Sequence, residues 1–152
     1  MNKNIKIVPV SAEHLEAIAR LEKLCFSEPW SKKSLELLTR RGIAMGLAAV
    51  DTTEPEAKLL GYVGMMTVLD EGQITNVAVL PERRGEGIGQ ALISALIGYC
   101  QENGFISLSL EVRESNSVAI RLYKRAGFKT AGKRKNFYKA PTEDGIVMTK
   151  DI

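Results

Sequence analysis

One junction constrains this chain more than any other: an apolar strand pattern ends at Pro81, and a glycine-rich segment then leads directly into a helix pattern. The strand pattern is QITNVAVLP, residues 73–81, and proline ends it because proline has no N–H for a strand ladder. The helix pattern covers about 87–102 and stops at Gly104. Its apolar face consists of Ile88, Leu92, Ala95, Leu96 and Tyr99. A strand that feeds a helix in this way predicts an α/β fold in which helix packs on sheet.

The segment between this strand and this helix has the chemistry of an anion site. The first N–H groups of a helix have no partner within it, and the helix dipole makes that end positive. Glycines at 85, 87 and 89 remove side chains that would keep a pyrophosphate away from these amides. The G-x-G-x-G spacing disfavours a dinucleotide fold, and the missing Gly-Lys-Ser/Thr excludes a Walker loop. A tight turn without a ligand would have the same local sequence.

Short apolar runs and helix-capping residues divide the rest of the chain. Helices are predicted over about 11–24, 31–42 and 116–127, with Ser11, Ser31 and Asn116 as their N-caps. Further strands are predicted at 4–10, 44–50, 59–69, 107–112, 128–134 and 145–150. This order is a mixed α/β arrangement whose helices can cover both faces of one central sheet.

Length, charge and cysteine spacing limit the class of protein. A chain of 152 residues has the usual size of one domain, so residues 1–152 are expected to form a single domain. The 21 basic and 18 acidic residues give a net charge of +3, too even to indicate a specific nucleic-acid partner. Cys25 and Cys100 match neither a disulfide framework nor a metal-binding spacing. No membrane span or signal peptide is recognised, so a cytoplasmic location is expected.

The glycine-rich segment resembles the pyrophosphate loop of the GNAT superfamily of N-acetyltransferases, which has the form Q/R-x-x-G-x-G/A. The matching residues here are Arg84 to Gly89. The resemblance continues in ITNVAVLPERRGEGIGQALI, residues 74–93, and in LEVRESNSVAIRLYKRAGF, residues 110–128. It therefore covers much of the second half of the chain. The resemblance implies the GNAT fold, a central mixed and mostly antiparallel sheet that is splayed at the acetyl-CoA site and has helices on both faces.

The same resemblance implies which residues bind acetyl-CoA. In GNAT enzymes the strand before the loop pairs through its backbone with the pantetheine arm, and by position that segment is Val77, Ala78 and Val79. Asn116 would contact the arm where the sheet opens. The implied residues of the pyrophosphate loop are Arg84, Gly85, Glu86, Gly87, Ile88, Gly89 and Gln90. Acetyl-CoA is thus the expected co-substrate, and no metal is expected.

Glu111 is the candidate general base. An amine must be neutral to attack a thioester, and an α-amine with a pKa near 8 is mostly protonated at neutral pH. Glu111 ends an apolar strand, where a purely structural position would rather hold an apolar or neutral residue. In relatives the glutamate of the L-E-V-R segment is regarded as the base, acting directly or through a water. A strand-end carboxylate that only faces solvent would fit the same sequence.

Tyr123 is the candidate general acid for the departing CoA thiolate. Its segment looks like the GNAT pattern S-N-x-x-A-x-x-L-Y, whose tyrosine is assigned that role. The residue also falls on an ordinary helical packing stripe, so a core aromatic is the alternative. The implied mechanism is direct transfer of the acetyl group to the amine, with a backbone amide near the splayed strand stabilising the oxyanion. Transfer through Cys25 or Cys100 is disfavoured, since a nucleophilic cysteine needs a nearby base and Cys100 falls on a regular helix.

Within the superfamily the chain resembles the RimI-type enzymes, which acetylate the N-terminal alanine of ribosomal small-subunit protein eighteen. The segments that carry this resemblance are residues 26–31, 74–79 and 132–138, followed by Pro141, Glu143 and Asp144. By analogy, Trp30 and Tyr138 would lie against the acceptor peptide, although Trp30 also suits plain core packing. Relatives usually have two tyrosines where this chain has Phe137-Tyr138, and the second hydroxyl is retained. A ribosomal protein N-terminus is therefore the expected partner.

Two other functions fit parts of the sequence. A GNAT enzyme that acetylates lysine side chains, other protein N-termini or small amines would have the same donor loop, because the acceptor pocket alone decides between them. A non-catalytic CoA-binding or interaction module would also need the glycine loop. Such a module has no chemical use for Glu111 and Tyr123, whose presence favours an enzyme.

Overall fold

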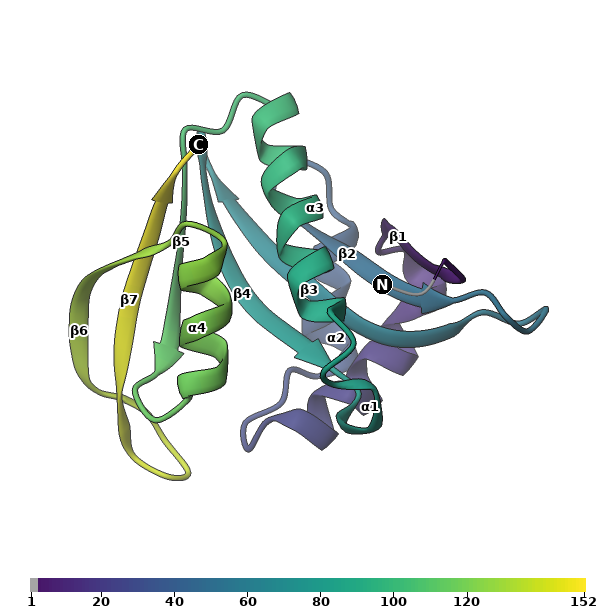
Figure 1. Ribbon diagram of the computed structural model, residues 1–152, viewed down its shortest axis with the longest axis horizontal. Helices are drawn as coiled ribbons and strands as arrows, with labels where there is room; N and C mark the ends of the chain where they lie inside the picture. The colour runs from purple at the N-terminus through teal and green to yellow at the C-terminus, as the bar shows by residue number, and fades with distance from the viewer. Residues whose placement is uncertain (1–2) are drawn as a thin grey trace.

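The computed structural model describes residues 3–152 and contains a seven-stranded sheet of order β1-β2-β3-β4-β5-β7-β6 (Figure 1). The strands are β1 Ile5–Pro9, β2 Ala44–Asp51, β3 Lys58–Val68, β4 Glu71–Val79, β5 Ser107–Arg113, β6 Lys129–Tyr138 and β7 Glu143–Asp151. Every neighbouring pair is antiparallel except β4 and β5, which are parallel. The predicted mixed, mostly antiparallel sheet is confirmed.

Helices lie on both faces of this sheet, as predicted, with α3 and α4 in front in Figure 1 and α1 and α2 behind. The helices are α1 Leu15–Cys25, α2 Lys32–Leu35, α3 Ile88–Glu102 and α4 Ser117–Arg125. Short 3-10 turns at Ala12–His14, Glu36–Thr39 and Pro81–Arg83 extend or connect them.

The second predicted helix, 31–42, is wrong in length. Ser31 does cap α2, since its hydroxyl accepts the N–H of Ser34 at 3.2 Å, but α2 gives way after one turn to a 3-10 turn that ends at Thr39. The segment buries only Leu35 and Leu38, and a spacing of three residues suits the tighter turn. The strand expected at 128–134 also differs, since β6 reaches Tyr138 and forms one side of a hairpin with β7.

Two apolar layers hold the helices against the sheet. The layer under α3 includes Ile93 and Cys100, which the predicted helix face omitted, whereas the predicted Ala95 and Tyr99 are only half-buried. Burial raises the pKa of the Cys100 thiol to about 11, so it is an inert core residue. The other layer lies under α1 and α2 and includes Ile18, Leu21 and Tyr62.

The sheet opens between β4 and β5. β4 pairs with β3 along residues 71–79, but it pairs with β5 only where 71–73 meet 107–109. Beyond that point the two strands separate, as the predicted splay requires. The register with β3 also shifts between Gly64 and Met65, whose partners are Asn76 and Ile74, so that Thr75 is an extra, bulged residue beside the opening.

Candidate active site

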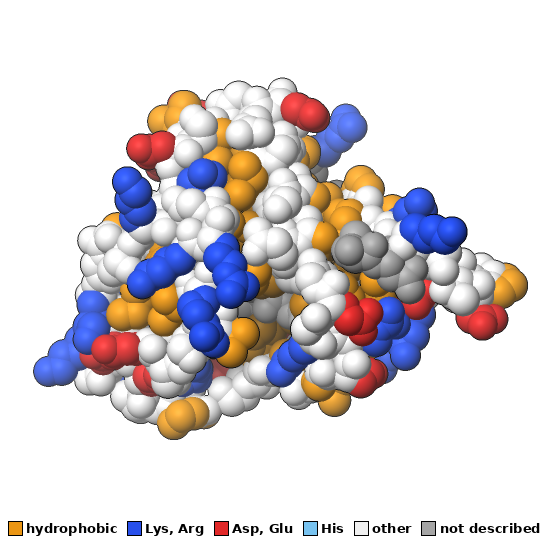
Figure 2. Space-filling model, viewed as in Figure 1, with side chains coloured by type: hydrophobic (Ala, Val, Ile, Leu, Met, Phe, Trp, Pro, Cys, Tyr) orange, Lys and Arg blue, Asp and Glu red, His pale blue; other side chains and the backbone are white. Residues whose placement is uncertain are grey.

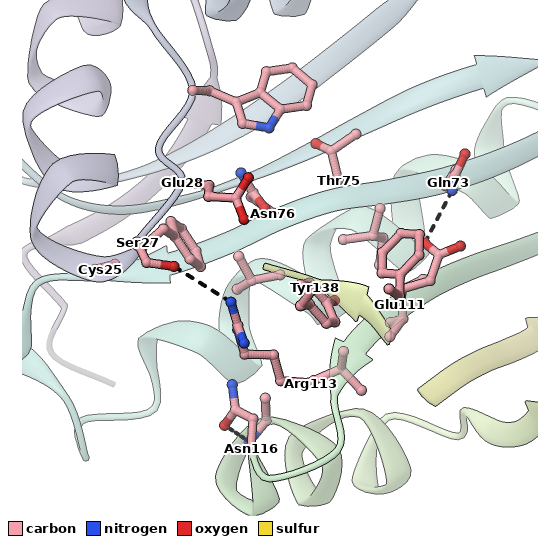
Figure 3. Close-up of a pocket in the computed structure, with 18 of the residues that line it drawn as sticks. Cys25, Ser27, Glu28, Gln73, Thr75, Asn76, Glu111, Arg113, Asn116 and Tyr138 are labelled. Atoms are coloured by element: carbon pink, nitrogen blue, oxygen red, sulfur yellow. Dashed lines mark hydrogen bonds between the residues drawn. The ribbon is translucent and has the colours of Figure 1, made fainter. Parts of the chain in front are cut away.

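A cavity of about 580 Å³ lies where β4 and β5 separate. Its walls come from the α1–α2 loop, β4, β5, α4 and the β6–β7 hairpin, and Figure 3 shows side chains from these segments converging on it. The sequence-predicted residues that line the cavity are Trp30, Val77, Glu111, Asn116, Tyr123 and Tyr138. Segments far apart in the sequence thus bring both candidate catalytic residues and both candidate acceptor residues together.

The cavity passes between the two faces of the sheet. Alternate residues of β5, including Leu110 and Val112, pack in the layer under α3, so Glu111 and Arg113 face the α1 side. Tyr123 belongs to the α3 layer instead. The candidate base and the candidate acid therefore approach the opening from opposite faces of the sheet, an arrangement that suits an acceptor and a donor arriving from different sides.

Glu111 lies on the cavity wall and is largely buried, with 13% of its side chain exposed. One carboxylate oxygen accepts a hydrogen bond from Gln73 Nε2 at 3.2 Å, and the other lies 3.4 Å from Arg134 Nε. The side chain thus points into the site rather than to bulk solvent. The sequence did not predict that Gln73 and Arg134 contact Glu111, because these contacts depend on the pairing of β4 with β5, of β5 with β7 and of β7 with β6.

Tyr123 is 7% exposed, and its ring packs edge-on against Phe128 with centroids 5.8 Å apart. Within residues 3–152 its hydroxyl has no hydrogen-bond partner, and no side-chain oxygen or nitrogen there is both sealed from solvent and unpaired. The hydroxyl is therefore open to the cavity that the residue lines. Burial raises the pKa of Tyr123 above its ordinary value, which keeps the proton on the phenol at neutral pH.

Arg113 fixes the hairpin that carries Tyr138. Its guanidinium donates to the carbonyls of Lys139 and Pro141 at 2.7 and 2.9 Å, and lies 4.7 Å from the centre of the Tyr138 ring. It also reaches the Ser27 hydroxyl at 3.5 Å (Figure 3), which links the hairpin to the α1–α2 loop. Burial, chiefly, raises the pKa of Tyr138 to about 12. The sequence motif L-E-V-R contained Arg113, but its role was not predicted.

The glycine-rich loop has the expected anion-binding features. Gly85 and Gly87 adopt φ of +84° and +83°, values that side-chain-bearing residues rarely take. In the described part of the chain, the backbone amides of Ile88, Gly89 and Gln90 have no acceptor, and the first turn of α3 contains no acidic residue. The positive end of the helix dipole is thus uncompensated there.

Several of the predicted loop and strand residues have other contacts for their side chains. Ala78 and Ile88 are buried in the core, so only their backbone atoms can meet a ligand. Arg84 turns back to the Val79 carbonyl at 3.3 Å and to the Cys25 sulfur at 3.4 Å, and Glu86 pairs with Arg83 at 2.8 Å. At these positions, acetyl-CoA would therefore be bound by backbone groups rather than by side chains.

The sequence profile of the Acetyltransferase (GNAT) family matches residues 15–128, which include the loop, both strands of the opening and α4. The chain belongs to the GNAT family of acetyltransferases. The predicted resemblance to this family is confirmed. The sheet that opens between β4 and β5 is the splayed arrangement that this resemblance implied.

Relatives of this GNAT chain include proteins that carry a named activity. One from Bacillus subtilis strain 168, provisionally named a [ribosomal protein bS18]-alanine N-acetyltransferase, is 38% identical over 138 residues, which are 90% of this chain and 88% of that one. An Escherichia coli K12 protein named [ribosomal protein bS18]-alanine N-acetyltransferase is 35% identical over 143 residues, 91% of either chain. The crystal structure of the ribosomal-protein-S18-alanine N-acetyltransferase from Escherichia coli matches with a TM-score of 0.87 and 31% identity, covering 97% of this chain and 94% of that one.

No helix within residues 3–152 is long and apolar enough to cross a bilayer. No group of three or more His, Cys, Asp or Glu side chains in the same range converges as metal ligands do.

Proposed function

We propose that this GNAT enzyme transfers the acetyl group of acetyl-CoA directly to the N-terminal α-amine of ribosomal protein bS18, whose first residue is alanine. The observation that carries this is the cavity at the splay of β4 and β5, which Glu111 and Tyr123 enter from opposite faces. The names of the relatives supply the substrate. A ribosomal substrate implies action in the cytoplasm. We also take residues 1–152 as one domain, because two apolar layers share one sheet.

The residues of the donor side fit acetyl-CoA. The free amides at the start of α3 and the absence of acidic residues in its first turn suit a pyrophosphate. The β4 edge that β5 leaves unpaired, beyond residue 73, suits the amide groups of a pantetheine arm. Exposed Arg121, Lys124 and Arg125 on α4 add positive charge on the same face, where Figure 2 shows Lys and Arg side chains gathered.

The protein residues have three roles in the proposed reaction. Glu111 takes a proton from the attacking amine, directly or through one water. A backbone amide on β4 stabilises the oxyanion that forms on the carbonyl oxygen of the thioester when the amine attacks its carbon. Tyr123, whose phenol is protonated at physiological pH, donates a hydrogen bond to the departing thiolate and supplies its proton, which water restores after CoA leaves. No covalent acetyl-enzyme is formed in this proposal: Cys100 is sealed in the core, and the Cys25 thiol at the cavity contacts the Val79 carbonyl and the Arg84 guanidinium rather than a carboxylate or imidazole base.

A synthetic peptide tests the acceptor. The peptide has the bS18 N-terminal sequence of the host and one internal lysine, and it is incubated with acetyl-CoA and the enzyme. We expect one acetyl group, which fragment-ion mass spectra place on the α-amine. Acetylation of the lysine instead would point to a side-chain acetyltransferase, and no product would reject this acceptor.

A substitution at Gly87 tests the conformation of the glycine-rich loop. Gly87→Ala forces an alanine into a left-handed conformation, which costs about 1–2 kcal/mol, and it turns the free amides away from their present direction. We expect a KM for acetyl-CoA that is about tenfold higher, with a lower melting temperature. Gly98→Ala is the matched control: it lies in the middle of α3 in ordinary helical geometry with open space around its Cβ, and we expect it to be slightly more stable with an unchanged KM.

A further inference from the structure

Glu22 is a buried carboxylate that the proposed reaction does not use. It lies on α1, is 0% exposed, and is the only fully buried charged side chain among residues 3–152. Its oxygens accept hydrogen bonds from the Trp30 backbone N–H at 2.8 Å, from the Tyr62 hydroxyl at 2.7 Å, and from Asn76 Nδ2 at 3.0 and 3.2 Å. Two of these three partners, Trp30 and Asn76, line the cavity. A buried charge is costly unless it is hydrogen-bonded in this way.

The bulge at Thr75 brings Asn76 to Glu22. Before the bulge, Ile74 packs in the layer under α3, and after it Ala78 packs in the layer under α1. Without the extra residue, Ile74, Asn76 and Ala78 would all share one face, because side chains alternate along a strand. The bulge re-aims Asn76 onto the α1 face, the face that Glu111 also occupies.

The carboxylate sets which end of the Asn76 amide faces the cavity. The Trp30 N–H and the Tyr62 hydroxyl already donate to this carboxylate, which can only accept, so the NH₂ end of Asn76 must point toward Glu22. Within residues 3–152, no group donates to Asn76 Oδ1, and no unpaired side-chain oxygen there is sealed from solvent. The amide oxygen is therefore exposed on the cavity wall, which Asn76 lines.

The register of β4 with β5 indicates which donor this oxygen meets. Gln73 lies opposite Ser109, so Glu111, two residues further along β5, faces the bulged segment of Thr75 and Asn76 across the opening between the two strands. An acceptor whose α-amine is bonded to Glu111 enters this opening between the two side chains. Its next N–H group, one residue along the peptide, is the donor that can reach the Asn76 amide oxygen.

We propose that Asn76 is a specificity-determining residue whose amide oxygen accepts a hydrogen bond from the N–H of the acceptor's second residue, and that Glu22 is the positioning residue that holds the amide in this orientation. The inference rests on the proposed function and deepens it. It selects a protein N-terminus over a lysine side chain, because a lysine amine has no peptide N–H one residue's length away.

A double-substitution cycle, with one change in the enzyme and one in the peptide, tests the hydrogen bond between Asn76 and the acceptor. The acceptor peptide is compared with a matched peptide in which an ester replaces the amide between residues one and two, so that this N–H is absent. Wild type and Asn76→Ala are assayed at about pH 9, where amines with a pKa near 8 are neutral. We expect kcat/KM to fall about five- to tenfold for either change alone, mainly through the KM of the peptide, with no further loss when both are combined.

The outcomes separate this inference from the proposed function. Losses that multiply, or an Asn76→Ala enzyme with wild-type KM, would overturn the hydrogen bond while leaving α-amine acetylation intact. A wild-type enzyme that acetylates neither peptide contradicts the proposed function itself. The KM for acetyl-CoA serves as the internal control, and it should stay within about twofold, since Asn76 faces the acceptor side.

Two variants of the network test the positioning role. Glu22→Gln offers Asn76 both a donor and an acceptor, so the amide can turn over, and we expect the KM of the peptide to rise several-fold. Tyr62→Phe removes another hydrogen bond from the same carboxylate but leaves Asn76 held, so it should be less stable with an unchanged KM. Equal changes in KM for both variants would mean that Glu22 acts through the general stability of α1, which contradicts the positioning role.

Discussion

Glu111→Gln is expected to lower kcat/KM for the α-amine peptide by about 10²- to 10⁴-fold, the usual contribution of a general base. The carboxamide keeps the shape of the side chain and an oxygen for the Gln73 contact, but it cannot take the proton. The deficit should narrow as the pH rises past the amine's pKa near 8, because an amine that is already neutral needs less help from a base. Steady-state kinetics across this pH range measure both effects.

Glu114→Gln is the matched control for this variant. Glu114 follows β5 on the surface, where its carboxylate is 48% exposed and pairs with Lys133 at 2.9 Å. The same chemical change there removes only an exposed ion pair, so activity should be unchanged. If Glu111→Gln retained activity within about threefold of wild type, the assignment of Glu111 as base would be wrong.

Tyr123→Phe is expected to lower kcat by about a hundredfold or more, with little change in the KM for acetyl-CoA. The phenyl ring keeps the edge-on contact with Phe128, so the variant removes the hydroxyl and little else. The loss should appear in kcat, because the hydroxyl acts on the thiolate that develops only in the transition state.

Tyr99→Phe provides the comparison for this second variant. Tyr99 is a half-buried tyrosine of α3 that packs against Phe105, outside the cavity. It should behave as wild type in both kcat and KM. If Tyr123→Phe had the same kcat as wild type, Tyr123 would be a packing residue and not the general acid. Its position on the apolar stripe of the helix allowed that alternative.

Much of the donor side could be predicted from the sequence because its determinants are local. A strand stopped by Pro81, positive-φ positions filled by Gly85 and Gly87, and a helix with an apolar face are readable within twenty or so residues. The splay of β4 from β5 was not readable in this way. It depends on where two strands cease to pair, and only the family resemblance supplied it.

The acceptor side could be predicted only in part. Trp30 and Tyr138 were placed by resemblance, and both line the cavity. Asn76 lay within a quoted motif, but its direction depends on a bulge opposite Gly64 that no period-two pattern reveals. The sequence contains one local signal for Glu22, because this acidic residue falls on the apolar stripe of an amphipathic helix. Its hydrogen-bond partners, however, come from residues up to 54 positions away.

The central claim, acetylation of the α-amine of bS18, is tested most directly in the host cell. The intact mass of bS18 is measured in ribosomes from a strain that lacks this gene and from the same strain carrying either the wild-type or the Glu111→Gln gene. The account predicts one acetyl group on bS18 with the wild-type gene, and an unmodified N-terminus in the deletion strain and with Glu111→Gln. Full acetylation of bS18 in the deletion strain would contradict it.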